Sequence, residues 1–386
     1  MSAIYHLTYL QAIVIGLIQG LTELFPISSL GHTVLVPSWL GGSWATLVSQ
    51  ESRSESPYLA FVVGLHLATA LVLIAFYWRE WVRVVRGLVT SIATWRVESD
   101  EQRLAWLLVI ATIPVGIAGL ALEHTFRVLF AKPLAAAIFL TLNGGILFLG
   151  ERYRRRASAE VVPLGAVQVS ADLAGPATSP PRFAGPASLA AQVESTQVKP
   201  TQADRTHAGG TQADAAHAGA AHAGAQAGGT QAGETQAGGM QAGGTDAGGT
   251  QVDEAAQRRL AGIGWGSALW IGAAQILALF AGISREGVTM AGGLVRGLSH
   301  EDALRFSFLL STPVILAAGA LKIPDLTGSL GAGIRGQVIA GSVAAALTSV
   351  LAVVFLARYF RTRTLTPFAI YCAAAGLISI VRFGLF

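Results

Sequence analysis

The sequence is poor in charge and in cysteine. Only 12% of its 386 residues are charged and 52% are hydrophobic, whereas soluble domains carry roughly 25% charged residues. The single cysteine, Cys372, lies inside an apolar run, which excludes a disulfide framework and a thiolate metal site. The net charge is only +4, and the arginines gather at the ends of apolar runs, which argues against nucleic-acid binding. Lipid is therefore the expected solvent for most of the chain.

Long apolar runs dominate what is present. A membrane span takes about 20 predominantly apolar residues, and six windows qualify: 57–78, 104–122, 133–150, 304–321, 337–357 and 367–386. Two further apolar regions, 10–40 and 265–298, are interrupted by Gly, Pro, Ser and charged residues. Irregular backbone at membrane depth is tolerated only where protein or a wet cavity surrounds it. We therefore predict an all-α polytopic membrane protein with about six transmembrane helices plus two broken, re-entrant helix pairs.

Between the two groups of spans the composition changes to Gly, Ala, Gln, Thr, Ser and Pro, with near-repeats such as Ala-Gly-Gly-Thr-Gln-Ala. Such a segment cannot bury enough apolar surface to offset its conformational entropy. The predicted parts are a first membrane half at 1–156, a disordered low-complexity cytoplasmic loop at 157–256 and a second membrane half at 257–386. The loop is assigned to the cytoplasm because arginine-rich ends mark that side.

The two broken regions also resemble each other. A shift of 256 positions places Gln19 on Gln275, Ser28 on Ser284 and Gly31 on Gly287. With the topology above, the two regions enter the membrane from opposite faces, which is typical of inverted-topology repeats that meet near the midplane. We expect the functional site to lie between them.

The first broken region carries Glu23 within an apolar segment, where an ionised carboxylate is costly and usually marks function. Pro26 disfavours helix at the residue before it, so Ser28 or Ser29 can cap a new helix whose free N–H groups suit an anion. We interpret Glu23 as a ligand of a divalent cation or as a general base. His32, one helical turn after Ser28 and Ser29, is close enough to be the nucleophile or to activate a hydroxyl group.

The second broken region carries Arg285, whose planar, permanently charged guanidinium can clamp a phosphoryl group. Gly282 and Gly287 allow the backbone to approach a ligand closely. Ser284 and Thr289 can donate hydrogen bonds to the same oxygens. A helix contact between small residues would explain the glycines but leaves the charge unexplained.

These two regions resemble the signature motifs of the undecaprenyl-diphosphate phosphatase family, historically called the bacitracin-resistance protein family. The first resembles its Glu/Gln-x-x-x-Glu motif running into Pro-x-Ser-Ser-x-Gly-His, matched by Gln19, Glu23, Pro26, Ser28, Ser29, Gly31 and His32. The second resembles its Pro-Gly-x-Ser-Arg-Ser-Gly-x-Thr motif, matched by Gly282, Ser284, Arg285, Gly287 and Thr289. The likeness extends to the closing Pro-Phe-Ala-Ile-Tyr run and covers nearly all of the chain outside the low-complexity loop.

The resemblance implies a hydrolase that acts on the diphosphate of a C55 polyprenyl lipid at the outer face of the bacterial cytoplasmic membrane, with a divalent cation (Mg²⁺ or Ca²⁺) as cofactor. The expected catalytic residues are Glu23, which also holds the metal, and Ser29, His32 and Arg285. The expected substrate-binding residues are Gln19, Ser28, Gly282, Ser284, Gly287 and Thr289. The expected partners are the polyprenyl diphosphate and membrane lipid, with a homodimer as a possible assembly; bacitracin is affected only indirectly, through the shared lipid.

The mechanism that this implies leaves the attacking group open. Glu23, assisted by Gln19, would position the cation on the diphosphate, and Ser29, His32 or a water molecule would attack the terminal phosphoryl group. Two residues depart from the family pattern: Ala281 stands in place of Pro, and Glu286 in place of Ser. Glu286 would pair with the neighbouring arginine, bind the cation or weaken phosphate affinity, and the sequence does not choose among these roles.

Two other classes of membrane protein are alternatives to the phosphatase. A transporter or flippase of a polyprenyl phosphate would also use inverted repeats, broken helices and a charged site at the midplane. Such a protein would need Glu23 and Arg285 but would have no need of the Ser-Ser-x-Gly-His run. A lipid phosphatase of the phosphatidic-acid-phosphatase type is disfavoured because its Lys…Arg-Pro, Pro-Ser-Gly-His and Ser-Arg…His motifs are not found.

Overall fold

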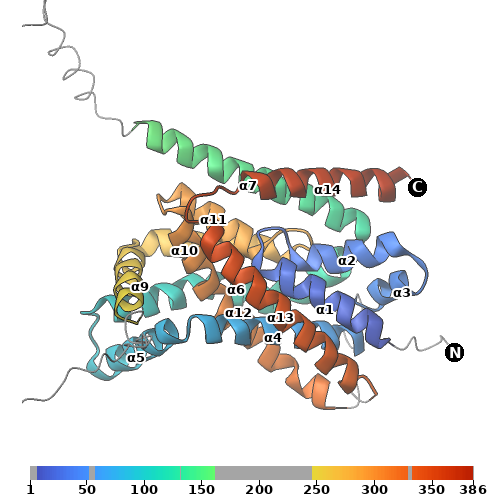
Figure 1. The fold of residues 1–386 in the computed structure, drawn as a ribbon, viewed down its shortest axis with the longest axis horizontal. Coiled ribbons are helices and arrows are strands. Elements are labelled where there is room, and N and C mark those ends of the chain that lie inside the picture. Colours follow the sequence, from blue (N-terminus) through green and yellow to red (C-terminus); the bar gives the residue numbers. More distant parts are fainter. Residues whose placement is uncertain (1–6, 52–56, 131, 161–245, 329–332, 386) are drawn as a thin grey trace, which may run out of the picture. The chain divides into compact units, whose positions relative to one another are not determined.

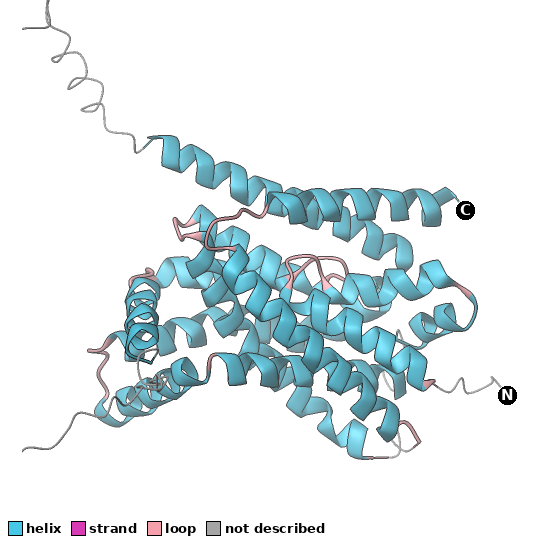
Figure 2. Ribbon diagram, viewed as in Figure 1, coloured by secondary structure: helices cyan, strands magenta, loops and turns pink. Residues whose placement is uncertain are grey.

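The computed structural model describes residues 7–51, 57–130, 132–160, 246–328 and 333–385 (Figure 1). Within these ranges all regular secondary structure is helical (Figure 2). The first half contains α1 (Tyr9–Leu24), α2 (Ser29–Leu40), α3 (Gly42–Glu51), α4 (Pro57–Phe76), α5 (Trp78–Thr94), α6 (Asp100–Phe130) and α7 (Pro133–Glu160). The second half contains α9 (Asp246–Ala261), α10 (Trp265–Ala274), the short 3₁₀ helix η1 (Gln275–Leu279), α11 (Arg285–Val295), α12 (His300–Thr327), α13 (Arg335–Tyr359) and α14 (Thr366–Leu385).

Five helices are long and apolar enough to cross a membrane, over Asp100–Leu122, Pro133–Arg156, His300–Leu321, Arg335–Tyr359 and Thr366–Leu385. They correspond to five of the six predicted spans. Two bent helix pairs, Phe61–Phe76 with Trp78–Thr94 and Asp253–Ala261 with Trp265–Leu279, raise the count to as many as seven if each is one span. The fold class is confirmed as an all-α polytopic membrane protein.

The remaining predicted span, 57–78, agrees with the structure to within two residues. It forms α4, which stops at Phe76, and after Tyr77 the chain turns by 87° into α5. Helix α5 is amphipathic, with an exposed apolar face that includes Val82, Val85 and Val89. Their spacing of three and four residues is a helical signal present in the sequence.

The two halves of the chain pack against each other along most of their length. Helix α1 lies along α13, α4 packs on α12, and α7 runs beside α14, as Figure 1 shows. A core cluster draws on both halves, with Leu24, Leu140, Leu294, Phe308 and Val353 among its buried members. The two halves of the chain therefore share one core, to which Leu24 at the end of α1 belongs.

Helix also extends into both ends of the segment that we expected to be disordered. Helix α7 continues to Glu160 and α9 begins at Asp246, so 157–160 and 246–256 are helical rather than disordered. Helix α9 is held by ion pairs to α12: Arg259 binds Asp302 at 2.9 Å, and Asp253 accepts from Arg305 at 2.7 Å. These ion pairs stabilise α9, which has few apolar side chains to bury. The rest of the predicted loop, 161–245, lies outside the described residues.

Candidate active site

Helix α1 places two predicted site residues one turn apart at its end. Gln19 is fully buried and Glu23 is 4% exposed, and the amide nitrogen of Gln19 donates to Oε2 of Glu23 at 3.0 Å. The helix ends at Leu24 because the residue before Pro26 adopts an extended conformation, with φ −73° and ψ 146° at Phe25. The predicted break in the first region is therefore present, and it leaves the Glu23 carboxylate at the end of a helix.

The turn that follows is held in a strained conformation. Ser28 has φ 70°, a left-handed value that costs a residue other than glycine about 1–3 kcal/mol. Its hydroxyl oxygen caps α2 by accepting from the N–H of Gly31 at 3.1 Å. Directly after it, Ser29 opens α2 and donates its hydroxyl proton to Oε2 of Glu23. The strained turn thus brings a serine hydroxyl onto the buried carboxylate.

The second broken region forms a turn of the same kind. The chain leaves η1 at Leu279, Gly282 adopts φ 114°, and α11 begins at Arg285. Ser284 caps α11, because its hydroxyl oxygen accepts from the N–H of Gly287 at 3.0 Å. The hydroxyl group also donates to the carbonyl oxygen of Phe25 at 3.3 Å, which joins this turn to the first one.

Two further contacts join the turns. Gly31 and Gly282 meet backbone to backbone: a Cβ added to Gly31 would lie 2.9 Å from the Cα of Gly282. Asn143 of α7, which is fully buried, donates to the carbonyl oxygen of Pro26 at 3.0 Å and accepts from the N–H of Ser284 at 3.1 Å. The prediction that the two motifs meet is confirmed by these contacts, whereas their inverted orientation in the membrane stays a prediction.

Arg285 is the cation of this site. Its Nε and Nη1 atoms are buried, and within the described part of the chain they have no hydrogen-bond partner. Its charge interacts with the carboxylates of Glu23 and of Glu286, which is 2% exposed. A guanidinium with two unpaired buried N–H groups is suited to an anionic ligand. The first-turn amides of α2 and α11, which lack partners within their own helices, add positive potential at the same turns.

Several predicted binding residues already make hydrogen bonds within the protein. The hydroxyl groups of Ser28 and Ser284 cap helices, and the N–H of Gly287 serves the second cap. Thr289 donates to the carbonyl oxygen of Arg285 at 2.8 Å and bonds to the hydroxyl of Ser307 on α12. In this arrangement the hydroxyl protons of Ser284 and Thr289 are donated within the fold, whereas the Ser28 hydroxyl group only accepts and keeps its proton available. Their role in substrate binding stays a prediction.

The structure adds to the site three residues that the sequence analysis did not select. His66 of α4 lies with Nε2 3.4 Å from Oε2 of Glu23. Tyr371 of α14 contacts His32 through its hydroxyl group, and Asn143 bridges the turns. Each is a polar side chain on an apolar helix, and such a residue was the only signal that the sequence offered.

A divalent cation fits the site only together with other ligands. Among the described residues, no group of three or more His, Cys, Asp or Glu side chains could hold a metal ion. The carboxylate of Glu23 and the buried, unpaired amide oxygen of Gln19 are hard oxygen ligands of the kind that Mg²⁺ and Ca²⁺ prefer. Mg²⁺ sites commonly combine one or two carboxylates with water and substrate phosphates. The residues present therefore fit a cation that is bound jointly with a diphosphate.

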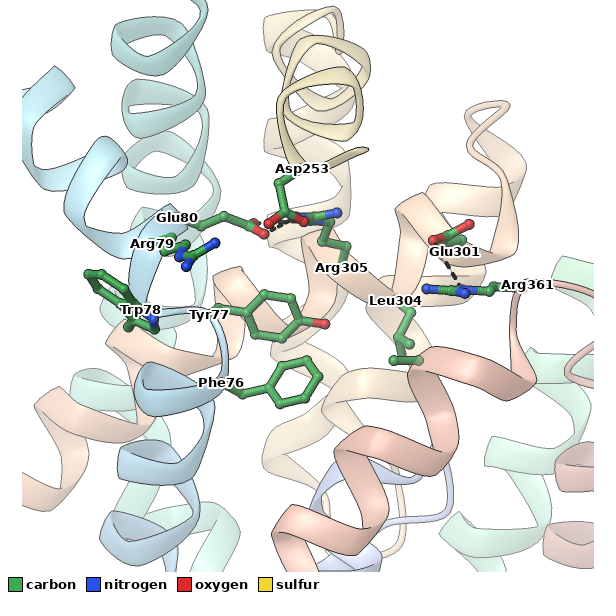
Figure 3. A pocket seen from close by; sticks show the side chains of 11 residues that line it. Phe76, Tyr77, Trp78, Arg79, Glu80, Asp253, Glu301, Leu304, Arg305 and Arg361 are labelled. Carbon is green, nitrogen blue, oxygen red and sulfur yellow. Dashed lines mark hydrogen bonds and ion pairs between the residues drawn. The ribbon is translucent and has the colours of Figure 1, made fainter. Parts of the chain in front are cut away.

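A separate cavity of about 390 Å³ lies at the bend between α4 and α5 (Figure 3). On one side Arg305 of α12 binds Glu80 of α5 through Nε at 3.0 Å and Asp253 of α9 at 2.7 Å. On the other side Arg361 faces Glu301 at 3.8 Å. None of the predicted site residues lines this cavity. Its charges join α5, α9 and α12, and we assign them to the stability of the fold.

The fold and the candidate site together define a polytopic helical membrane protein in which a buried arginine and a buried carboxylate lie where two broken helices meet. The chain belongs to the bacitracin resistance protein BacA family, whose model matches residues 12–179 and 236–378. It is 52% identical to undecaprenyl-diphosphatase 2 of Frankia alni, over 99% of each chain. It is 46% identical to the undecaprenyl-diphosphatase of Mycolicibacterium paratuberculosis, over 97% of each chain. It is 33% identical to that of Granulibacter bethesdensis, over 95% of this chain and 94% of the relative.

Proposed function

We propose that this protein hydrolyses undecaprenyl diphosphate to undecaprenyl phosphate and inorganic phosphate. The observation that carries the proposal is the contact between the hydroxyl group of Ser29 and the buried carboxylate of Glu23, beside the unpaired guanidinium of Arg285. The relatives that are called undecaprenyl-diphosphatases, with nearly full-length matches, support the same substrate. Hydrolysis recycles the lipid carrier of cell-wall synthesis, and it confers bacitracin resistance by depleting the lipid that the drug targets.

The geometry favours Ser29 as the attacking group among the three alternatives. Glu23 takes the hydroxyl proton while the Oγ of Ser29 forms a bond to the terminal phosphorus and the bond to the bridging oxygen breaks. Undecaprenyl phosphate leaves with the bridging oxygen, and water then hydrolyses the phosphoserine and restores the hydroxyl group. Arg285 holds the transferred phosphoryl group and offsets its charge. A cation held by Glu23 and Gln19 would neutralise charge on the diphosphate oxygens when bound.

The distribution of arginines supports a proposal for how the protein lies in its membrane. The arginines at 152–156 and 358–363 lie at the ends of α7 and α13, and the positive-inside rule puts such ends in the cytoplasm. We propose that the chain resides in the bacterial cytoplasmic membrane with its site open to the outer face. A homodimer also stays a proposal; it would cover part of the exposed apolar face of α14, where Ile370, Leu377 and Ile378 lie.

The proposal is tested by phosphate release from undecaprenyl diphosphate in detergent. Purified wild-type protein should release phosphate in the presence of Mg²⁺ or Ca²⁺, and removal of the metal by a chelator should reduce the rate to near background, because the diphosphate charge is then unscreened. Re-addition of the cation should restore the rate. If monodisperse protein released no phosphate with either cation but moved a polyprenyl phosphate across liposome membranes, the transporter would replace the phosphatase.

Substitution of Gly31 tests the contact between the two turns. Gly31→Ala places a methyl group 2.9 Å from the Cα of Gly282, so the turns must move apart. Because misplacement by about 1 Å can cost about a hundredfold in rate, we expect phosphate release to fall by about that factor. Gly116→Ala on α6 is the matched control, since its added Cβ meets nothing within 4 Å. Equal rates for the two variants would contradict a site that depends on this contact.

A further inference from the structure

Both ring nitrogens of His32 are occupied. Nδ1 lies 2.6 Å from the carbonyl oxygen of Ser28, and because a carbonyl oxygen only accepts, Nδ1 carries a proton. Nε2 lies 2.8 Å from the hydroxyl group of Tyr371. In the neutral ring Nε2 has only a lone pair, so the tyrosine hydroxyl group is the donor. The neighbours of the imidazole therefore select one tautomer and leave no lone pair for a phosphorus atom or for another hydroxyl group.

Tyr371 holds this ring in two ways. Besides the hydrogen bond, the two rings stack with centroids 5.7 Å apart and planes 10° from parallel. Tyr371 stands on α14, 339 residues after His32 in the sequence. It is the last residue of the run Pro-Phe-Ala-Ile-Tyr, to which the sequence assigns no chemical role. Helix α14 thus contacts α2 close to the turn that contains Ser28.

The ring of His32 acts on the turn through the carbonyl group of Ser28. That oxygen accepts from the backbone N–H of His32 at 3.2 Å as well as from Nδ1. Ser28 is the residue with the left-handed φ of 70°, and Ser29 follows it directly. Such a conformation persists only when the surroundings over-determine it. The imidazole N–H is one of the contacts that fix the turn and hence the direction of the Ser29 hydroxyl group.

We propose that Tyr371 is a positioning residue that acts through His32. Its hydroxyl group keeps the imidazole proton on Nδ1, the proton binds the carbonyl of Ser28, and the turn then presents Ser29 to Glu23 and to the substrate. Without that hydroxyl group, the ring is free to take its other tautomer and to release the turn. The role rests on the proposed phosphatase reaction, because it concerns the group that attacks.

The test is Tyr371→Phe, which keeps the stacked ring and removes only the hydroxyl group. We expect kcat for undecaprenyl diphosphate to fall about tenfold with KM changed by less than about twofold, because the substitution disturbs the attacking group and leaves substrate binding intact. In a His32→Gln background the same substitution should cause no further loss, since residues that act through one another are not additive. Tyr371→Leu, which also removes the ring, should lose at least as much activity as Tyr371→Phe.

The matched control is Ser379→Ala, which removes another hydrogen bond between α2 and α14, from Nε1 of Trp39 at 3.1 Å. It should leave kcat near wild type, and thermal unfolding of all variants shows whether each is folded. If the wild type is active and Tyr371→Phe has the same kcat, the proposal is overturned. An equal loss in the wild-type and His32→Gln backgrounds would also overturn it. An inactive, well-folded wild type would instead contradict the proposed function itself.

Discussion

Replacement of Arg285 by alanine is expected to lower phosphate release from undecaprenyl diphosphate by about a thousandfold or more. Arginines that stabilise the charge of a transferred phosphoryl group contribute about 10³–10⁵ in kcat. Arg285 has the features of such a residue, since Nε and Nη1 are buried and have no hydrogen-bond partner among the described residues. The measurement is the steady-state rate in detergent with Mg²⁺ or Ca²⁺ present.

The same helix supplies a matched control for this substitution. Arg296 ends α11 and is exposed, and Arg296→Ala should leave the rate within about twofold of wild type, as expected for a surface residue remote from the chemistry. Arg285→Lys should recover only part of the loss, because an ammonium group cannot reproduce a two-pronged guanidinium contact. A folded Arg285→Ala protein with more than about a tenth of wild-type activity would contradict the assigned role.

The structure narrows the roles that the sequence left open for Glu286, the neighbour of Arg285. Glu286 is 2% exposed, and its charge interacts with both Glu23 and Arg285. It therefore lies within the site rather than on a lipid-facing or solvent-facing surface. The site thus places the carboxyl groups of Glu23 and Glu286 near one guanidinium, with His66 against the first of them.

The two breaks in the apolar regions could be predicted because local chemistry determines them. Pro26 ends α1 whatever lies around it, and Gly282 accepts a left-handed conformation that other residues resist. The capping serines follow from the same local rules. Glu23 and Arg285 could be selected because a charge in an apolar segment is costly and therefore informative.

The rest of the site depends on contacts between distant segments. His66, Asn143 and Tyr371 belong to α4, α7 and α14, and each is a polar residue within an apolar stretch of its helix. Nothing in their spacing relates them to Glu23 or to the turns, because only the packing of α7 on α14 and of α1 beside α4 brings them there. The sequence likewise does not show that Ser307 is the neighbour of Thr289, whose hydroxyl group was predicted to bind substrate.

One arginine joins α5, which follows the bend after α4, to α9. Arg305 of α12 is 8% exposed and is bound to Glu80 of α5 and to Asp253 of α9, so a single cation fixes both helices. The sequence predicted disorder to 256 because it could not show that Asp253 pairs with Arg305. Long-range charge pairing thus overrides one local expectation.

Substitution of this arginine should therefore affect stability more than activity. Arg305→Ala leaves the buried Glu80, which is 4% exposed, without its partner, and breaking a buried ion pair on one side costs about 3–5 kcal/mol. Arg361→Ala in the same cavity is the control, because Arg361 and Glu301 are 63% and 39% exposed and such pairs contribute about 0–1 kcal/mol (Figure 3). The free energy of unfolding in detergent should separate the two variants clearly. Adding Glu80→Gln to Arg305→Ala should regain part of the loss, since it removes the stranded charge; equal stabilities for Arg305→Ala and Arg361→Ala would show that the pair does not hold α5 in place.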